Sequence, residues 1–234
     1  MPIFEFNLPK GLSKALGLPT KSPRTAQMRV LKKLLKTAQY TSFGQKFKFE
    51  QILKHRHIGK SFQESVPTYN YNKIYKDWWH LTLEGQSDIC WPGKIKYFAL
   101  SSGTSEAASK YIPITNDLLR GNKIIMIKQL VSLFKYREIP ISAIGKGWLT
   151  LGGSTDLQKG AGYYAGDLSG ITAKKSPFWF QPFYKPGKKI AKERDWNKKL
   201  KEIVEKAPEW DISFVVGVPA WIQMCLEMVI ARYQ

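Results

Sequence analysis

The sequence predicts an α/β protein in which mixed sheets are flanked by helices, with a mainly helical segment over residues 1–90. Helix-period apolar patterns dominate that first segment, whereas β-branched and aromatic runs begin near residue 95. From there strand-like and helix-like runs alternate along the chain, which is typical of α/β folds. The 234 residues are 43% hydrophobic, so the chain can bury a substantial core.

The first segment contains three helical patterns. Residues 23–39 carry lysines on one side and an apolar stripe on the other, which predicts an amphipathic helix. Residues 49–55 and 69–79 are also compatible with helix, and Val66 is expected to be extended because a proline follows it. The apolar stripe of the first helix comprises Met28, Leu31, Leu34, Leu35 and Ala38.

Two strands are predicted on either side of a loop over residues 101–110. Residues 95–100 precede the loop and residues 111–115 follow it, and both runs are rich in β-branched and aromatic side chains. Pro113 disfavours a helical conformation at the residue before it, which supports extended chain after the loop.

A long apolar helix is predicted next. Thr115 or Asn116 suits its N-cap, and the pattern reaches the mid-130s. Because the helix is apolar on more than one face, we expect it to be buried against a sheet on at least one side.

The rest of the chain alternates between predicted strands and helices. Residues 147–151 and 212–216 have strand patterns, and residues 195–206 and 220–232 have helix patterns. Residues 154–187 are rich in glycine, proline and aromatic residues and are predicted to be long loops with short strands. The last helix is heavily apolar and is expected to be buried, so the lack of a C-cap and of a following element indicates a piece of a longer protein.

The chain has a formal net charge of +19, which favours an anionic partner. Such a charge suits nucleic acid, an anionic membrane or an anionic small substrate. No zinc-finger spacing or RNP-like aromatic run accompanies the lysines, so no nucleic-acid partner is predicted, and a solvated basic surface is the simpler explanation. No membrane partner is predicted either, because Pro219, Gln223 and Glu227 argue against a span over residues 214–231. A basic module for nucleic acid or anionic membranes stays open as an alternative.

Cysteine and histidine usage gives no sign of a metal site or a disulfide framework. Cys90 and Cys225 are far apart in the sequence, and His55, His57 and His80 have no neighbouring cysteine. The N-terminus has no basic start followed by a sustained apolar run, so no secretory signal is predicted and a cytoplasmic location is expected.

The loop over residues 101–110 is the most informative motif. It is made of small, mostly hydroxyl-bearing residues and ends at Lys110, a composition that can surround a phosphate with N–H groups, hydroxyls and one positive charge. A Walker-type loop would carry Gly-Lys-Ser/Thr and run straight into a helix, whereas this loop lies between predicted strands. The simpler alternative is a solvated connection.

The order Ser-Ser-Gly-Thr-Ser followed by a lysine resembles the signature of the auxin-responsive acyl acid amido synthetases, within the acyl-adenylate-forming superfamily. Further short patches resemble bacterial members of that family in the same order, so the resemblance covers nearly the whole chain. These patches are residues 34–44, 66–67, 91–93, 166–169 and 217–219.

The resemblance implies that residues 1–234 are an incomplete N-terminal large domain, with helical residues 1–90, α/β residues 91–234 and missing C-terminal parts. It implies an enzyme that uses ATP to convert a carboxylic acid into an acyl-adenylate and then transfers the acyl group to an amine such as an amino acid. ATP and Mg²⁺ are the implied cofactors, because negative charge builds on the phosphates in the first step. This piece alone is expected to be inactive.

The resemblance also assigns residues to sites, although it leaves the catalytic residues, the oligomeric state and the identity of the acid and amine unassigned. The phosphate-binding set is Ser101, Ser102, Gly103, Thr104, Ser105 and Lys110, where Lys110 either contacts phosphate or anchors the loop. The candidates for the substrate pocket are Tyr163, Tyr164, Val218 and Trp221.

Two departures from the family pattern matter. The plant pattern has a glycine near Ala107, and Glu106 adds a negative charge beside the expected phosphate site. An inactive adenylate-forming fold therefore stays open as a further alternative. Residues 163–167 resemble the superfamily's Tyr-Arg-x-Gly-Asp ribose motif but lack the arginine and come too early. We therefore interpret Asp167 as part of the family's earlier Gly-Asp-Leu-Ser segment, near the acyl pocket.

Overall fold

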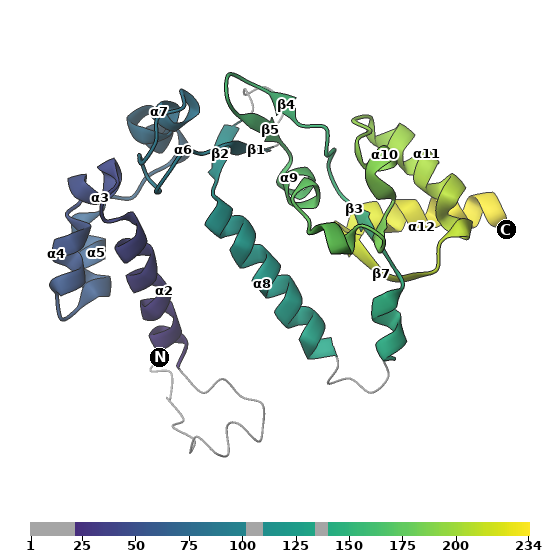
Figure 1. Ribbon diagram of the computed structural model, residues 1–234, viewed down its shortest axis with the longest axis horizontal. Helices are drawn as coiled ribbons and strands as arrows, with labels where there is room; N and C mark the ends of the chain where they lie inside the picture. Colours follow the sequence, from purple (N-terminus) through teal and green to yellow (C-terminus); the bar gives the residue numbers. More distant parts are fainter. Residues whose placement is uncertain (1–21, 102–109, 134–139) are drawn as a thin grey trace, which may run out of the picture. The chain divides into compact units, whose positions relative to one another are not determined.

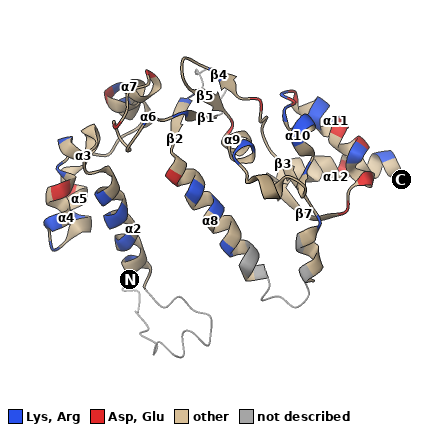
Figure 2. Cartoon of the chain, viewed as in Figure 1, with Lys and Arg blue, Asp and Glu red and all other residues tan. Residues whose placement is uncertain are grey.

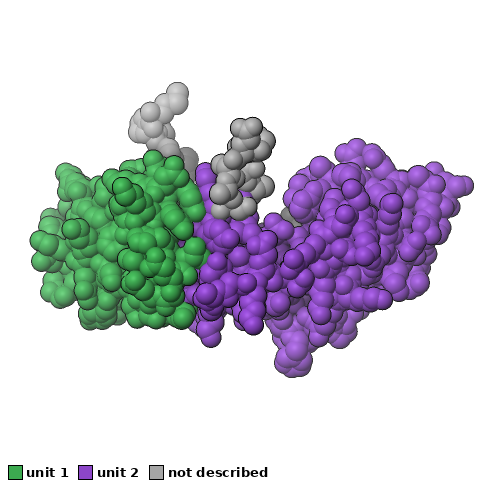
Figure 3. All heavy atoms as spheres, turned by 90° about the horizontal axis from the view of Figure 1, so that it is seen from above, with its two compact units in different colours: residues 1–94 green, residues 95–234 purple. Residues whose placement is uncertain are grey.

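The computed structural model describes residues 22–101, 110–133 and 140–234 (Figure 1). The chain divides into two compact units, residues 1–94 and residues 95–234, which Figure 3 shows in green and purple. The first unit is helical in its described part, and the second contains two sheets with helices. The predicted fold class is therefore confirmed.

The helical unit is a series of short helices after one longer helix. Three of these helices begin at side-chain caps. Ser22 Oγ accepts from the Thr25 N–H, Thr41 Oγ1 accepts from the Gly44 N–H at 3.0 Å, and Asn70 Oδ1 accepts from the Lys73 N–H at 2.9 Å. The helix α2 matches its prediction to within one residue. The elements are α2 (Pro23–Ala38), α3 (Ser42–Lys46), α4 (Phe49–Lys54), α5 (Ile58–Ser65), α6 (Tyr71–Ile74), the π-helical η1 (Tyr75–Trp79) and α7 (His80–Leu83).

The core of this unit lies where α2 packs against α4 and α5. Leu35 and Ala38 are buried there together with Phe49 and Ile52. The predicted apolar stripe of α2 is wider than the face that is covered, because Met28 and Leu34 stay 38% and 46% exposed. The periodicity thus located the helix but overestimated its buried face.

The first sheet of the α/β unit, in the order β2-β1-β5-β4, contains the predicted hairpin. Strands β1 (Tyr97–Ser101) and β2 (Lys110–Ile114) pair antiparallel, with Ser101 opposite Lys110. On its other side β1 pairs parallel to β5 (Tyr164–Gly166), which pairs antiparallel to β4 (Gln158–Lys159). Both strands beside the loop are confirmed, so the loop connects strand to strand.

The second sheet, in the order β6-β3-β7, is entirely parallel. Its strands are β6 (Tyr184–Lys185), β3 (Gly147–Leu151) and β7 (Ile212–Gly217). A buried cluster of apolar side chains from β3 and the following helices packs beside it. The helices of this part are η2 (Ile141–Gly145), η3 (Phe178–Phe180), α10 (Gly187–Ala191), α11 (Trp196–Lys206), η4 (Ala207–Glu209) and α12 (Pro219–Tyr233).

Two helices are less buried than predicted. Helix α8 (Asn116–Leu133) has its expected bounds, and Thr115 Oγ1 accepts from the Leu118 N–H, but Leu119 is the buried apolar side chain of its described part. In α12 the fully buried residue is Cys225. The expectation of burial holds for the start of α8, where Leu119 packs with Ala99 and Ile114, and for the face of α12 around Cys225. It fails for the rest of both helices, because an apolar sequence does not reveal which of its faces a neighbour covers. The exposed apolar side chains are Leu118, Ile124, Ile125 and Ile127 on α8, and Met224, Leu226 and Ile230 on α12.

The prediction of loops and short strands over residues 154–187 missed α9 (Leu168–Lys174). This helix depends on a tertiary contact, because a Cβ at Gly170 would collide with the Ser154 carbonyl oxygen. The glycine that weakens the local helix signal is therefore the residue that allows α9 to pack.

Candidate functional site

A cavity of about 360 Å³ lies in the α/β unit at the carboxyl ends of β1, β3 and β5. Its volume falls in the range of small-molecule sites, and the carboxyl edge of α/β sheets is their usual location. The strand ends and the turns after them contribute Leu100, Gly153, Ser154, Ala165, Gly166 and Asp167. The remaining wall comprises Asp156, Gln158, Arg194, Trp196, Lys199 and Trp221.

The turn after β3 and the start of α9 are fitted closely to each other at the cavity. A Cβ at Gly153 would collide with the carboxylate of Asp167, so this carboxylate lies directly against the glycine backbone. The Gly153 N–H also donates to Ser169 Oγ at 2.9 Å. These contacts hold Asp167, the N-cap residue of α9, at the wall of the cavity.

Lys199 provides a buried cation in the same wall. Its residue is 3% exposed, and its Nζ donates to the Gly152 carbonyl oxygen at 3.2 Å. Burial lowers the pKa of the Lys199 ammonium, and the negative charges of Asp167 and Glu193 oppose that shift. The helix that carries it is fixed at its start, because Asp195 accepts from the Lys198 N–H at 2.8 Å.

Two tryptophans form an apolar wall. The rings of Trp196 and Trp221 are 4.4 Å apart between centroids, with 39° between their planes. Among the described atoms, the buried Nε1 of Trp196 has no hydrogen-bond partner. At the rim Arg194 pairs with Asp156 at 2.9 Å, but both side chains are more than half exposed, so this pair contributes little to stability.

The predicted phosphate loop begins at this cavity. Leu100 lines the wall, Ser101 ends β1, and Lys110 begins β2 at the position opposite Ser101. The rest of the predicted loop lies outside the described residues, and its phosphate role stays a prediction. That part comprises Ser102, Gly103, Thr104 and Ser105, together with Glu106 and Ala107.

The four predicted pocket residues do not all lie together. Trp221 lines the cavity, whereas the other three are not among its lining residues. Tyr164 stacks on Tyr97 with ring centroids 5.8 Å apart, and Tyr163 packs edge-on against Phe98. Val218 is the exposed N-cap residue of α12. Their role in substrate binding stays a prediction.

Sequence reasoning missed Trp196 and Lys199. The missed signal was present in the helix pattern over residues 195–206, where Lys199 occupies a position on the apolar stripe between Trp196 and Ile203. A lone cation on an otherwise buried face is unusual and can mark a site.

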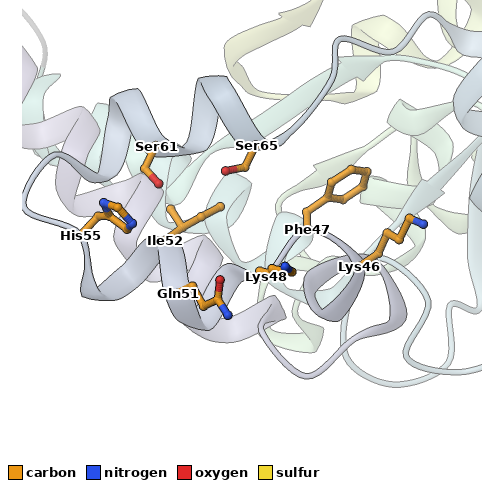
Figure 4. Close-up of a pocket in the computed structure, with 8 residues that line it drawn as sticks. All are labelled: Lys46, Phe47, Lys48, Gln51, Ile52, His55, Ser61 and Ser65. Carbon is orange, nitrogen blue, oxygen red and sulfur yellow. The ribbon is translucent and has the colours of Figure 1, made fainter.

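A second cavity, of about 260 Å³, lies in the helical unit between α3, α4 and α5 (Figure 4). Its lysines are exposed, and Ser61 and Ser65 project into it from α5. Lys48 adopts a left-handed backbone conformation with φ of 53°. The lining comprises Lys46, Phe47, Lys48, Gln51, Ile52, His55, Ser61 and Ser65.

Basic side chains are spread over the described surface. Figure 2 shows lysine and arginine on several helices, including α2, α8, α10 and α11. Within the described ranges, no group of three or more histidine, cysteine, aspartate or glutamate side chains is arranged to hold a metal ion. In the same ranges, no helix combines the length and apolar character needed to cross a bilayer.

The fold places the chain in a structural class. Two solved structures match it over 99% of its length, at 18% identity: "GH3.15 acyl acid amido synthetase", with a TM-score of 0.69, and "AtGH3.15 acyl acid amido synthetase in complex with 2,4-DB", with a TM-score of 0.64. The chain thus has the same fold as the matching part of these two structures. It covers 40% of the length of each of these structures.

The family follows from a comparison with family models. The model described as "GH3 family N-terminal domain" matches residues 13–202, which is most of the chain. The protein therefore belongs to the GH3 family. A search of curated proteins gave no match.

Proposed function

We propose that this chain is the N-terminal part of an ATP-dependent acyl acid amido synthetase that joins a carboxylic acid to an amine such as an amino acid, in the cytoplasm. Family membership supports the ligase class. The proposal rests on the cavity at the carboxyl ends of β1, β3 and β5. Leu100 lines this cavity, and the next residue, Ser101, is the first of the Ser-Ser-Gly-Thr-Ser motif. An activated acid needs its acyl site and its phosphate site to be adjacent.

The wall of the cavity suits an acid with a flat apolar group. Trp196 and Trp221 offer an aromatic surface, and Lys199 offers a positive charge in the same wall. A related synthetase has been solved in complex with 2,4-DB, which gives a first acid to test.

The residues at the ends of the hairpin loop fit a phosphate group in kind. Ser101 supplies a hydroxyl, and Lys110 supplies an ammonium at the facing strand position. We propose that these two groups hold ATP together with the loop between them, and that Mg²⁺ neutralises part of the phosphate charge. When bound, ATP supplies the α-phosphorus that the acid's carboxylate attacks as pyrophosphate leaves, and the amine later displaces AMP from the acyl carbon.

Acid-dependent exchange of pyrophosphate into ATP tests this function. The full-length product of the gene is assayed with a panel of carboxylic acids that includes 2,4-DB. We expect exchange with at least one acid and a loss of about 100-fold or more in Lys110→Ala, because the proposal assigns this cation to the developing phosphate charge. Lys128→Ala, on the exposed side of α8, serves as the matched control. Absence of exchange with every acid contradicts the proposal.

A further inference from the structure

Lys199 is the least expected member of the cavity wall. It lies on the inward face of α11, where Leu200, Ile203 and Val204 are all buried. Placing an ammonium on such a face costs free energy unless hydrogen bonds or opposite charges compensate for the lost water. The structure therefore has to account for this lysine.

In the described part of the chain, few hydrogen bonds and no close opposite charge compensate for the burial of the Lys199 ammonium. The ammonium has three hydrogens, and its hydrogen bond in this part of the chain is the one to the Gly152 carbonyl oxygen at 3.2 Å. No acidic oxygen of the described residues lies within 4.0 Å of it, although Asp167 and Glu193 are near enough to act electrostatically. Glu193 is occupied by Lys198 at 2.9 Å and by two backbone N–H groups. An anionic ligand in the cavity would supply the missing charge.

The lysine and the aromatic wall are parts of one surface. Trp196 lies three residues before Lys199, so both side chains project from the same face of α11. Trp221, from the first turn of α12, packs against Trp196. A ligand with a planar apolar group and an anionic end matches this combination of groups.

We propose that Lys199 is a binding residue that holds the carboxylate of an aryl carboxylic acid in the cavity, with the aryl group against Trp196 and Trp221. The assignment rests on the proposed function, because that function identifies the anion as the carboxylate of an acid substrate. Lys199 holds this group before any chemistry, so its effect appears in the affinity for the acid.

The test compares phenylacetate with the neutral phenylacetamide, which has nearly the same shape. Binding to this chain is followed by tryptophan fluorescence and by calorimetry. The substitution Lys199→Gln removes the charge but keeps a donor for the Gly152 carbonyl. We expect the wild type to prefer the carboxylate, and the variant to lose that preference by about tenfold or more, because hydrogen bonds to charged groups are strong. Affinity for the amide is expected to stay unchanged.

Three further variants serve as controls, and AMP is tested as a second ligand. Lys199→Arg keeps the charge and is expected to keep the preference, whereas Lys201→Gln removes an exposed lysine from the same helix and is expected to have no effect. Trp221→Phe is expected to reduce the fluorescence change. Circular dichroism checks the fold, and if Lys199→Gln fails to fold, the comparison of Lys199→Arg with the wild type decides.

Each outcome has a distinct meaning. A carboxylate preference that survives in Lys199→Gln, or that is absent from Lys199→Arg while that variant stays folded, overturns the role of Lys199 and leaves the proposed function standing. Equal loss of both ligands assigns the lysine a structural role and also overturns it. If Lys199→Gln loses affinity for AMP alone, Lys199 binds the nucleotide and not the acid, which overturns its proposed role. If the wild type binds neither phenylacetate nor any other acid of the panel, the proposed function fails and the inference fails with it.

Discussion

The cavity of the helical unit and the cavity of the α/β unit described above are both lined by lysine, but the lysines differ in their exposure to solvent. In the helical unit, Lys46 and Lys48 line a cavity but stay exposed to solvent. In the α/β unit, Lys199 is 3% exposed and lies in one wall with two tryptophans. An exposed lysine is already well solvated and gains little from a ligand, whereas a buried one gains much. The formal charge of +19 is thus a poor guide to the site, and the burial of one lysine is a better guide.

The largest expected effect is a loss of stability on truncating a core side chain, and it can be compared between the two units. Ile203→Ala in the α/β unit and Leu35→Ala in the helical unit each remove a fully buried side chain, so each should lower the free energy of unfolding by about 2–5 kcal/mol. Cys225 packs in the same cluster as Ile203, and Cys90 belongs to the other unit. Burial raises the pKa of both thiols, that of Cys90 to about 12, so both should react slowly in the folded chain.

Thiol labelling under mild denaturant checks this prediction. We expect Ile203→Ala to accelerate labelling of Cys225 more than that of Cys90, and Leu35→Ala to do the reverse. Equal acceleration of both cysteines in both variants would mean that the units unfold together, and the comparison between them would lose its basis.

Two glycine substitutions should have smaller effects, and comparing them distinguishes a loss of stability from a loss of phenylacetate binding. Gly153→Ala should push Asp167 away from the turn after β3, which lowers stability by about 1–3 kcal/mol and weakens phenylacetate binding about tenfold. Gly44→Ala in the helical unit meets the Ala38 carbonyl oxygen, so it should cost similar stability without changing phenylacetate affinity. Thermal unfolding and fluorescence titration measure the two quantities.

Gly121→Ala is the matched control for these glycine variants. A Cβ at this position meets nothing within 4 Å, and the residue lies inside α8. We expect it to stabilise the chain by about 0.5–1 kcal/mol, because alanine favours helix over glycine. A loss of phenylacetate affinity in Gly44→Ala would contradict the assignment of the site to the α/β unit.

The sequence was a good guide to the elements and a weaker guide to their surroundings. The strands on either side of residues 101–110 and the helix α11 were predicted because periodicity and β-propensity act locally. Lys199 was missed because its surroundings come from distant parts of the chain: its Nζ donates to the Gly152 carbonyl oxygen after β3, and the charge of Asp167 acts on it. The exposure of α8 could not be read from its apolar pattern, since that pattern is the same whether or not a neighbour covers the helix.

The smallest expected effect is a pH dependence. Burial lowers the pKa of Lys199, so between this lowered value and the ordinary value of 10.5 the unfolded chain binds more protons than the folded chain. The free energy of unfolding of the wild type should therefore rise relative to that of Lys199→Gln as the pH rises through this window. Denaturant titrations at a series of pH values check the sign. A difference that falls over the same range would contradict the burial of a charged ammonium at this position.

Hydrogen exchange of this chain, with and without phenylacetate, tests most directly whether the site lies in the α/β unit. Amide protection is read by mass spectrometry over peptides from both units. We predict that phenylacetate protects residues 152–169 and 194–199, two segments that contain most of the residues lining the cavity. Protection confined to residues 46–65, around the cavity of the helical unit, would contradict the account.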